Sequence, residues 1–262
     1  MGAHHWNEKR LRSVAANGGR ARKVYACTPL STIYTGTMSL ILNIDTSGTM
    51  AAISIADKGI VLAKKVNDAQ KEHASFLQAA IKHLFETLNL DMSAIDAVAV
   101  VIGPGSYTGL RVGLASAKGI CYALNKPLIS IGTLPLMAKA ALENVEDGVA
   151  ASLLYCPMID ARRQEVFTAI FKSNLEEVWP AQAHILNDDS FVATLLHHKI
   201  LFFGDGAAKF HTMTSNANAM FAGIYNPLEA LARFSFEKFS AKDFTTLAYS
   251  EPLYLKEFYN GQ

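Results

Sequence analysis

Two short segments of the chain combine residue types that could hold a phosphate group. The first, Asp45-Thr46-Ser47-Gly48-Thr49, lies between two apolar runs. A turn of small hydroxylated residues with one acid and one glycine exposes backbone N–H groups that can surround phosphate, while the acid can face a hydrated magnesium ion. Any hairpin turn favours the same residues, and on spacing alone a purely structural turn is the favoured interpretation.

The second segment, Gly103-Pro104-Gly105-Ser106-Tyr107-Thr108-Gly109-Leu110-Arg111, runs from a predicted strand into a predicted helix. Ser106 or Thr108 could cap that helix, and the N–H groups of its first turn could bind an anion. The spacing fits neither the Walker loop nor the dinucleotide pattern GxGxxG, which favours a structural turn. As candidates for vestigial phosphate or nucleotide loops we take Asp45, Thr46, Ser47, Gly103, Gly105, Ser106 and Thr108.

Other sets of catalytic residues are not evident. No two histidines are four residues apart and HExxH is absent, so we expect no histidine metal site and predict no metal ligands. A GxSxG nucleophile elbow is also absent. Asp160 and Glu165 could be catalytic carboxylates, but the favoured alternative is that they flank a hairpin turn through Arg162 and Arg163.

The charge of the chain is unevenly distributed along its 262 residues. Residues 1–37 hold six of the 24 Lys and Arg residues and one of the 23 acids, which leaves 18 basic against 22 acidic residues in the body. A mildly acidic body argues against a broad basic surface for a nucleic acid backbone. If RNA is involved, we expect another component to bind it.

Residues 1–37 form a basic leader without sustained periodicity. A targeting peptide, a disordered tail and an upstream extension outside the functional protein are the three alternatives, and we favour the extension, with Met38 as the natural start. The three cysteines are odd in number and form no CxxC pair, which favours a reducing cytoplasm. The richest apolar run, residues 109–124, is interrupted by Arg111 and Lys118, so we expect a soluble protein.

Hydrophobic periodicity predicts an α/β protein of two lobes. Antiparallel strands are expected at residues 40–44, 51–55 and 60–65. A helix at 72–89, a strand at 97–102, a helix that follows the 103–108 loop and ends near 124, a strand at 127–131 and a helix at 134–142 come next. The pattern restarts with strands at 153–159 and 165–171, a helix at 191–197, a strand at 199–203 and a helix at 228–239. This order suggests a duplicated design with parallel crossovers, divided into residues 38–146 and 147–262. One option for the last helix is that it packs back on the first lobe.

Small residues mark the helix that follows the glycine-rich loop. One face of this helix carries Gly109, Gly113 and Ala117. The adjacent face carries Ala115, Ser116, Gly119 and Ala123. Because each glycine costs about 1 kcal/mol relative to alanine in a helix, close approach by another backbone would be the compensation. The helix could therefore offer a docking face, and the alternative is that it only covers its own sheet.

Taken together, ILNIDTSGT, EHASFLQAAI, GPGSYTGLRVGLASAKG, IDARRQEVF, GDGA and EPLYLK resemble the TsaB (YeaZ) family of tRNA threonylcarbamoyladenosine biosynthesis proteins over residues 39–258. The resemblance implies an actin-like (ASKHA, sugar-kinase- and heat-shock-ATPase-like) fold of two duplicated lobes. It also implies a cytoplasmic, non-catalytic subunit that supports a TsaD-type paralogue, the transferase that modifies the adenosine beside the anticodon. A TsaE-type ATPase recycles the complex in such systems, and this chain would contact tRNA through the complex.

In this family the first-lobe helices pair with the paralogue, which implies an interface at His73, Leu77, Ile81, Arg111, Ala115, Lys118 and Gly119. A homodimer through the same helices is expected when the partner is absent. The resemblance implies no required cofactor and leaves room for ATP, ADP or Mg²⁺ at the complex interface. His73-Ala74-Ser75 stands where the family commonly has His-Ser-Glu, and Gln164 often replaces a Gly. The rival hypothesis is an independent actin-fold ATP-dependent kinase or ATPase, or a peptidase.

Overall fold

The first lobe is built on a five-stranded mixed sheet. The computed structural model describes residues 38–67, 73–223 and 227–256, so the basic leader lies outside the described residues. The elements of this lobe are β1 (Leu40–Asp45), β2 (Ala51–Asp57), β3 (Ile60–Asn67), α1 (His73–Leu88), the short 3-10 helix η2 (Met92–Ala94), β4 (Ala97–Gly103), α2 (Tyr107–Leu124), β5 (Leu128–Gly132) and α3 (Thr133–Leu142). The strand order is β3-β2-β1-β4-β5, antiparallel within the hairpins and parallel from β1 to β5.

The second lobe repeats this topology strand for strand. It contains α4 (Asp147–Ala150), β6 (Leu153–Asp160), β7 (Glu165–Phe171), β8 (Glu177–Ile185), α5 (Val192–Leu195), β9 (Lys199–Phe203), α6 (Ala207–His211) and β10 (Ala219–Phe221). The strands order as β8-β7-β6-β9-β10 with the same pattern of antiparallel and parallel pairs. The duplicated α/β design predicted from the sequence is therefore confirmed by the strand order.

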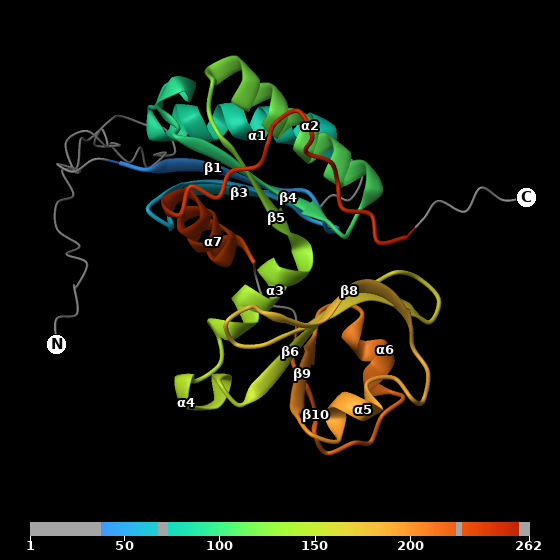
Figure 1. Cartoon of the computed structure of the whole chain (residues 1–262). Helices are drawn as coiled ribbons and strands as arrows, with labels where there is room; N and C mark the ends of the chain where they lie inside the picture. The colour runs from blue at the N-terminus through green and yellow to red at the C-terminus, as the bar shows by residue number, and fades with distance from the viewer. Residues whose placement is uncertain (1–37, 68–72, 224–226, 257–262) are drawn as a thin grey trace, which may run out of the picture.

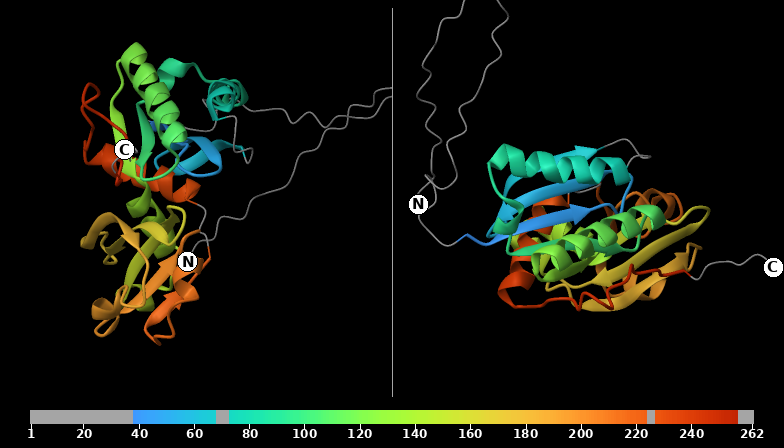
Figure 2. Two further views of the ribbon diagram at one scale, coloured as in Figure 1. Left: turned by 90° about the vertical axis from the view of Figure 1, so that its right-hand side faces the viewer. Right: turned by 90° about the horizontal axis from the view of Figure 1, so that it is seen from above.

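Helices cover both faces of the first sheet. α1 and α2 lie side by side on one face, and α7 (Leu228–Ser240) lies on the other (Figures 1 and 2). Alternation along the strands explains this arrangement, since Leu42 and Val100 face α1 and α2 whereas Ile41 and Val101 face α3 and α7. The first sheet is consequently buried on both faces, as parallel strands require.

α3 lies between the two sheets and joins them (Figure 1). Its Leu136 and Ala140 pack on the first sheet, whereas Leu134 and Ala138 pack on the second with Tyr155. The opposite face of the second sheet carries an aromatic cluster with α5 and α6. A helix that is apolar on two sides fixes the orientation of one lobe on the other.

The last part of the chain returns to the first lobe. Ala230 and Leu231 of α7 pack against Ile41 and Ile129 of the first sheet. Residues 244–256, which we call the tail strap, then follow the outer edge of β5 and run beside α2 (Figures 1 and 2). The first lobe thus includes residues 228–256 as well as residues 38–146.

Most helices and strands match the predicted ranges, but the short elements α4, α6 and β10 were not predicted, and two further differences have a clear cause. β8 was not predicted, because the Trp179-Pro180 pair interrupts its alternation, and Pro180 is tolerated since β8 is an edge strand. The helix expected at 191–197 is a single turn, because Phe191 has a left-handed backbone with φ 62°. Within the described residues, no helix is long and apolar enough to cross a membrane.

Candidate functional site

The first half of the β1–β2 turn, Asp45 to Ser47, is buried and its polar groups bond within the lobe. Asp45 Oδ1 accepts hydrogen bonds from the backbone N–H of Ser47 at 2.9 Å and from its hydroxyl at 2.7 Å. Thr46 Oγ1 donates to the carbonyl oxygen of Gly109 at 2.7 Å. The residues Asp45, Thr46 and Ser47 are 9%, 0% and 5% exposed and face the protein, whereas residues 48–50 at the tip of the turn are exposed.

The β4–α2 loop packs directly on this turn. The N–H of Ser106 donates to the carbonyl oxygen of Ser47 at 2.7 Å, and Ser106 Oγ accepts from the N–H of Gly109 at 3.3 Å as the helix cap. A Cβ atom at Gly105 or Gly109 would overlap the carbonyl oxygens of the turn. The glycines are therefore needed for close approach between two backbones.

The two candidate phosphate segments thus lie against each other, which the sequence did not predict. The N–H groups of Ser47, Ser106 and Gly109 each donate to an acceptor within the chain. Thr108, in the first turn of α2, is exposed. The N–H of Ser106 therefore joins the loop to the turn, whereas the N–H of Ser47 bonds within the turn and that of Gly109 bonds within the helix cap.

The tail strap lies over the same end of the sheet. The N–H of Leu253 donates to the carbonyl oxygen of Ile102 at 2.7 Å, and Lys118 Nζ donates to the carbonyl oxygen of Ser250 at 3.1 Å. At the far end, Lys256 forms an ion pair with Glu165 of β7 in the second lobe. The strap therefore connects β4 and α2 of the first lobe to β7 of the second lobe.

Arg111 is held between two tyrosines where α2 meets the strap. Its Nε donates to Tyr254 Oη at 2.9 Å, and its guanidinium carbon lies 3.9 Å from the centre of the Tyr107 ring. The two tyrosine rings are 5.3 Å apart. Acceptance of this hydrogen bond by Tyr254 raises the pKa of Arg111 above its ordinary value, so the side chain remains a cation.

An exposed stripe runs along the outer face of α2. Arg111, Ala115, Lys118 and Tyr122 recur at spacings of four, three and four residues, which places them on one side of the helix. Tyr122 is 83% exposed, and a Cβ atom at the neighbouring Gly119 would meet nothing within 4 Å. Of the predicted interface residues, Arg111, Ala115 and Gly119 are exposed and Lys118 is half-buried.

The part of the predicted interface on α1 needs a correction. Leu77 and Ile81 are 0% and 2% exposed because they pack into the core of their own lobe. They cannot gain burial from a partner, and the apolar stripe of α1 is the face that covers the sheet. His73 is the first residue of α1, and its side chain lies outside the described part of the structure.

The small residues of α2 serve two purposes on opposite faces. A Cβ atom at Gly109 or Gly113 would overlap Thr46, so the inward glycines admit the β1–β2 turn. Ala115 and Gly119 point away from the sheet and leave the outer face shallow. Gln78 of α1 donates to Ser116 Oγ of α2 at 3.1 Å, which ties the two helices at the surface.

The second lobe carries counterpart loops with different chemistry. Lys209 of α6 donates to Asp160 Oδ1 at 2.7 Å, and this bond lowers the pKa of that carboxyl. Asp160 also accepts from the N–H of Arg162, and Arg162 and Arg163 both have positive φ. Asp160 and Glu165 therefore flank a hairpin turn, as the favoured interpretation held. Within the described residues no group of three or more His, Cys, Asp or Glu is placed to hold a metal ion.

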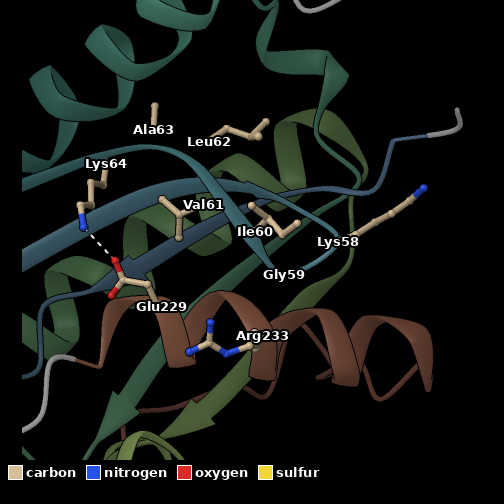
Figure 3. A pocket seen from close by; sticks show the side chains of 9 residues that line it. All are labelled: Lys58, Gly59, Ile60, Val61, Leu62, Ala63, Lys64, Glu229 and Arg233. Carbon is tan, nitrogen blue, oxygen red and sulfur yellow. Dashed lines mark hydrogen bonds and ion pairs between the residues drawn. The ribbon is translucent and has the colours of Figure 1, made fainter. Parts of the chain in front are cut away.

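A groove between the edge strand β3 and α7 is shown in Figure 3. Its Lys64 forms an ion pair with Glu229 at 2.8 Å, and its Arg233 is paired with Glu143. Of the charged groups that line this groove, Lys64, Glu229 and Arg233 are thus paired within the protein. We assign no ligand to it.

Buried thiols do not supply a nucleophile. Burial raises the pKa of Cys121 to about 11 and that of Cys156 to about 12. The reactive form of cysteine is the thiolate. Both side chains therefore remain protonated at neutral pH.

Comparison with known proteins gives a family and several relatives. The family model described as TsaD, tRNA N6-adenosine threonylcarbamoyltransferase, matches residues 67–250. A protein of Bacillus subtilis (strain 168) named tRNA threonylcarbamoyladenosine biosynthesis protein TsaB is 29% identical over 63% of this chain and 70% of its own length. Proteins of the same name from Haemophilus influenzae and Escherichia coli (strain K12) are 34% and 30% identical over 48% and 53% of this chain. These matches span 51% and 58% of their lengths.

Solved structures show the same fold. One described as YeaZ from Pseudomonas aeruginosa has a TM-score of 0.66 and 22% identity, and it covers 83% of this chain and all of its own. Another from Pseudomonas aeruginosa, described as similar to peptidase YEAZ, has a TM-score of 0.69 and 21% identity, covering 84% of this chain and all of its own. With the family match and the repeated strand order, these structures confirm the α/β actin-like fold.

Proposed function

We propose that this chain, which belongs to the TsaD family and within it to the TsaB (YeaZ) group, is a non-catalytic subunit in tRNA threonylcarbamoyladenosine biosynthesis. Its work is to bind and support a TsaD-type transferase that modifies the adenosine beside the anticodon. We expect a TsaE-type ATPase and tRNA to meet the assembled complex rather than this chain alone. The expected compartment is the cytoplasm.

The observation that carries this proposal is the mutual packing of the two candidate phosphate loops. Ser106 donates to Ser47, Thr46 donates to Gly109, and the glycines bring the backbones into contact. An actin-fold kinase would need N–H groups of these two loops for nucleotide phosphates, and here the N–H groups of Ser106 and Ser47 and the hydroxyl of Thr46 all donate within the chain. Here they stabilise the lobe, and Asp45 accepts from Ser47 within the same turn.

The outer face of α2 supports the docking part of the proposal. It is exposed, shallow around Ala115 and Gly119, and flanked by the strap with Tyr249, which is 85% exposed. Contiguous exposed apolar and aromatic surface is typical of protein interaction sites. Burial of this face by a helical partner needs no rearrangement of the first lobe.

Deletion of the gene tests the proposal in the cell. We expect threonylcarbamoyladenosine in tRNA, measured by mass spectrometry of nucleosides, to fall and to recover when the parental chain is restored. Complementation by Ala115→Glu should fail, whereas complementation by Ala208→Glu, at an exposed alanine of α6, should succeed. Unchanged modification after deletion would refute the proposal.

Turnover of ATP by the purified chain separates this function from that of an independent enzyme. We expect no hydrolysis above the rate of a heat-denatured sample, and no nucleotide cofactor is required by the proposal. ATP, ADP or Mg²⁺ at an interface with the partner would be compatible with it. Hydrolysis that Asp45→Ala abolishes in a folded protein would favour the enzyme.

A further inference from the structure

We propose that Arg111, held by Tyr107 and Tyr254, is a preformed receptor for a carboxylate of the transferase partner. The inference rests on the proposed function, because it assumes that the outer face of α2 is the docking face. It adds the chemistry by which that face selects its partner. It also gives the tail strap a function, since Tyr254 belongs to it.

The geometry restricts the guanidinium to one orientation. Tyr254 Oη accepts from Nε at 2.9 Å, and the face of Tyr107 lies 3.9 Å from the guanidinium carbon. Arginine has five N–H donors, and the bond to Tyr254 uses the Nε donor. The two terminal nitrogens together form the fork that matches a carboxylate.

The strap fixes Tyr254 independently of Arg111. The next residue before it, Leu253, donates to Ile102 at the end of β4 at 2.7 Å. Two residues after it, Lys256 is paired with Glu165 of the second lobe. Anchors on both sides of Tyr254 mean that the hydroxyl group is in place before a partner arrives, so less conformational entropy is lost on binding.

Charge identifies the partner group as an acid. In the described part of the chain, no carboxylate lies within ion-pair distance of Arg111, and α2 contains no Asp or Glu. Lys118 adds a second positive charge to the same stripe. Arg111 is thus an exposed cation with fixed donors, and no ion pair of the described residues joins it to an acid. Such a group is complementary to a carboxylate on another molecule.

The same charges argue against a second copy of this chain as the occupant. A two-fold interface places the same patch on both sides, and because α2 contains no Asp or Glu, the α2 stripe of a second copy brings no carboxylate to Arg111. α1 offers a single acid, Glu86, which is 3.8 Å from Lys82 of its own helix. We therefore choose the transferase, with acidic residues on its docking helix, over a homodimer.

Binding measurements with the purified transferase test this inference. Titration calorimetry would compare the parental chain with Arg111→Gln, Arg111→Lys, Tyr254→Phe and the double variant Arg111→Gln/Tyr254→Phe, at low and high salt. Arg163→Gln, at an exposed arginine of the second lobe, is the matched control for loss of charge. Thermal unfolding verifies that every variant is folded.

We expect Arg111→Gln to weaken binding at least about tenfold and Arg111→Lys to fall between it and the parental chain. Tyr254→Phe should weaken binding about three- to tenfold through loss of one hydrogen bond. The double variant should bind no more weakly than Arg111→Gln alone, because Tyr254 acts through Arg111. The variants without Arg111 should also lose part of the salt dependence.

Two results would overturn the inference, and they are distinguishable. Binding of Arg111→Gln within twofold of the parental chain, while Ala115→Glu does not bind, would remove the carboxylate receptor and leave the docking face intact. If Arg111→Gln and Ala115→Glu both bind with the parental affinity, the docking face and the receptor are both refuted. Additive effects in the double variant would show that Tyr254 does not act through Arg111.

Discussion

The two lobes share one topology but use the same pair of loops differently. In the first lobe, the β1–β2 turn and the β4–α2 loop are buried against each other through Thr46 and Gly109. In the second lobe, the turn after β6 is exposed and is linked to α6 by the Asp160–Lys209 ion pair. Strand order therefore fixes where these loops lie. Their side chains decide whether the two loops pack closely on each other or remain exposed.

The outer surfaces of the lobes differ in a second way. α2 has 18 residues and exposes a stripe beside the strap, whereas its counterpart α6 has five residues and covers an aromatic core with Phe210. A long helix with an exposed stripe can offer a partner a continuous surface. A single short turn cannot, which is why we place docking on the first lobe.

The largest expected effect separates these two surfaces. Ala115→Glu should weaken binding to the transferase at least about a hundredfold, because the longer side chain fills the shallow part of the face and its carboxylate lies one turn from Arg111, where it competes with an acid of the partner. Ala208→Glu should leave the affinity within twofold, since α6 lies outside the proposed interface. Co-expression followed by size-exclusion chromatography and calorimetry gives both values, and equal binding by the two variants would contradict the assignment.

The next effect distinguishes the inner and outer faces of α2. Gly109→Ala should lower the free energy of unfolding by about 2–4 kcal/mol, because its methyl group would overlap the carbonyl oxygen of Thr46. Gly119→Ala should raise it by up to about 1 kcal/mol, because the methyl group meets nothing within 4 Å and alanine favours the helix. Urea unfolding measures both, and a neutral Gly109→Ala would show that the loops are not tightly packed.

A smaller effect tests the hydrogen bonds within the β1–β2 turn. Asp45→Ala removes the acceptor of two hydrogen bonds from the buried Ser47, so we expect a loss of about 1–3 kcal/mol in the free energy of unfolding. Asp160→Ala, at the exposed counterpart in the second lobe, should cost less than about 1 kcal/mol. Similar losses in the two variants would mean that the turns do not differ as described.

The smallest effect is a pH dependence in the second lobe. Lys209 lowers the pKa of Asp160 below its ordinary value, so the pair stabilises the folded state above the unfolded pKa and is lost as pH falls through the folded pKa. Lys209→Met should cost about 0.5 kcal/mol at pH 7, since the pair is partly exposed. The part of the cost that comes from the ion pair should disappear once pH falls below the folded pKa of Asp160, and a cost that persists there would belong to the bond from Lys209 to the carbonyl oxygen of Glu165 at 3.1 Å or to packing.

Much of the fold follows from local patterns in the sequence. Apolar runs and alternation predicted the three strands that begin the first lobe and the first two strands of the second lobe, and Ser106 was one of the two residues proposed as the cap of α2. β8 escaped prediction because Pro180 breaks its alternation. The strap escaped because residues 244–256 have no period, and long-range backbone bonds hold them instead.

The candidate site was only partly predictable. The two loops were found from their residues, but their contact joins Thr46 to Gly109 across 63 positions, and no local pattern encodes it. The apolar stripe with Leu77 and Ile81 correctly predicted a helix with one buried face. Periodicity does not say what covers that face, and in the structure it is the helix's own sheet.

Hydroxyl-radical footprinting of the chain with and without the transferase tests the central claim most directly. Tyr122 and Tyr249 are 83% and 85% exposed in the free chain, and Leu196 of the second lobe is 67% exposed. We predict that oxidation of the two tyrosines falls strongly in the complex while oxidation of Leu196 is unchanged. Protection of Leu196 with both tyrosines still reactive would contradict docking through the first lobe.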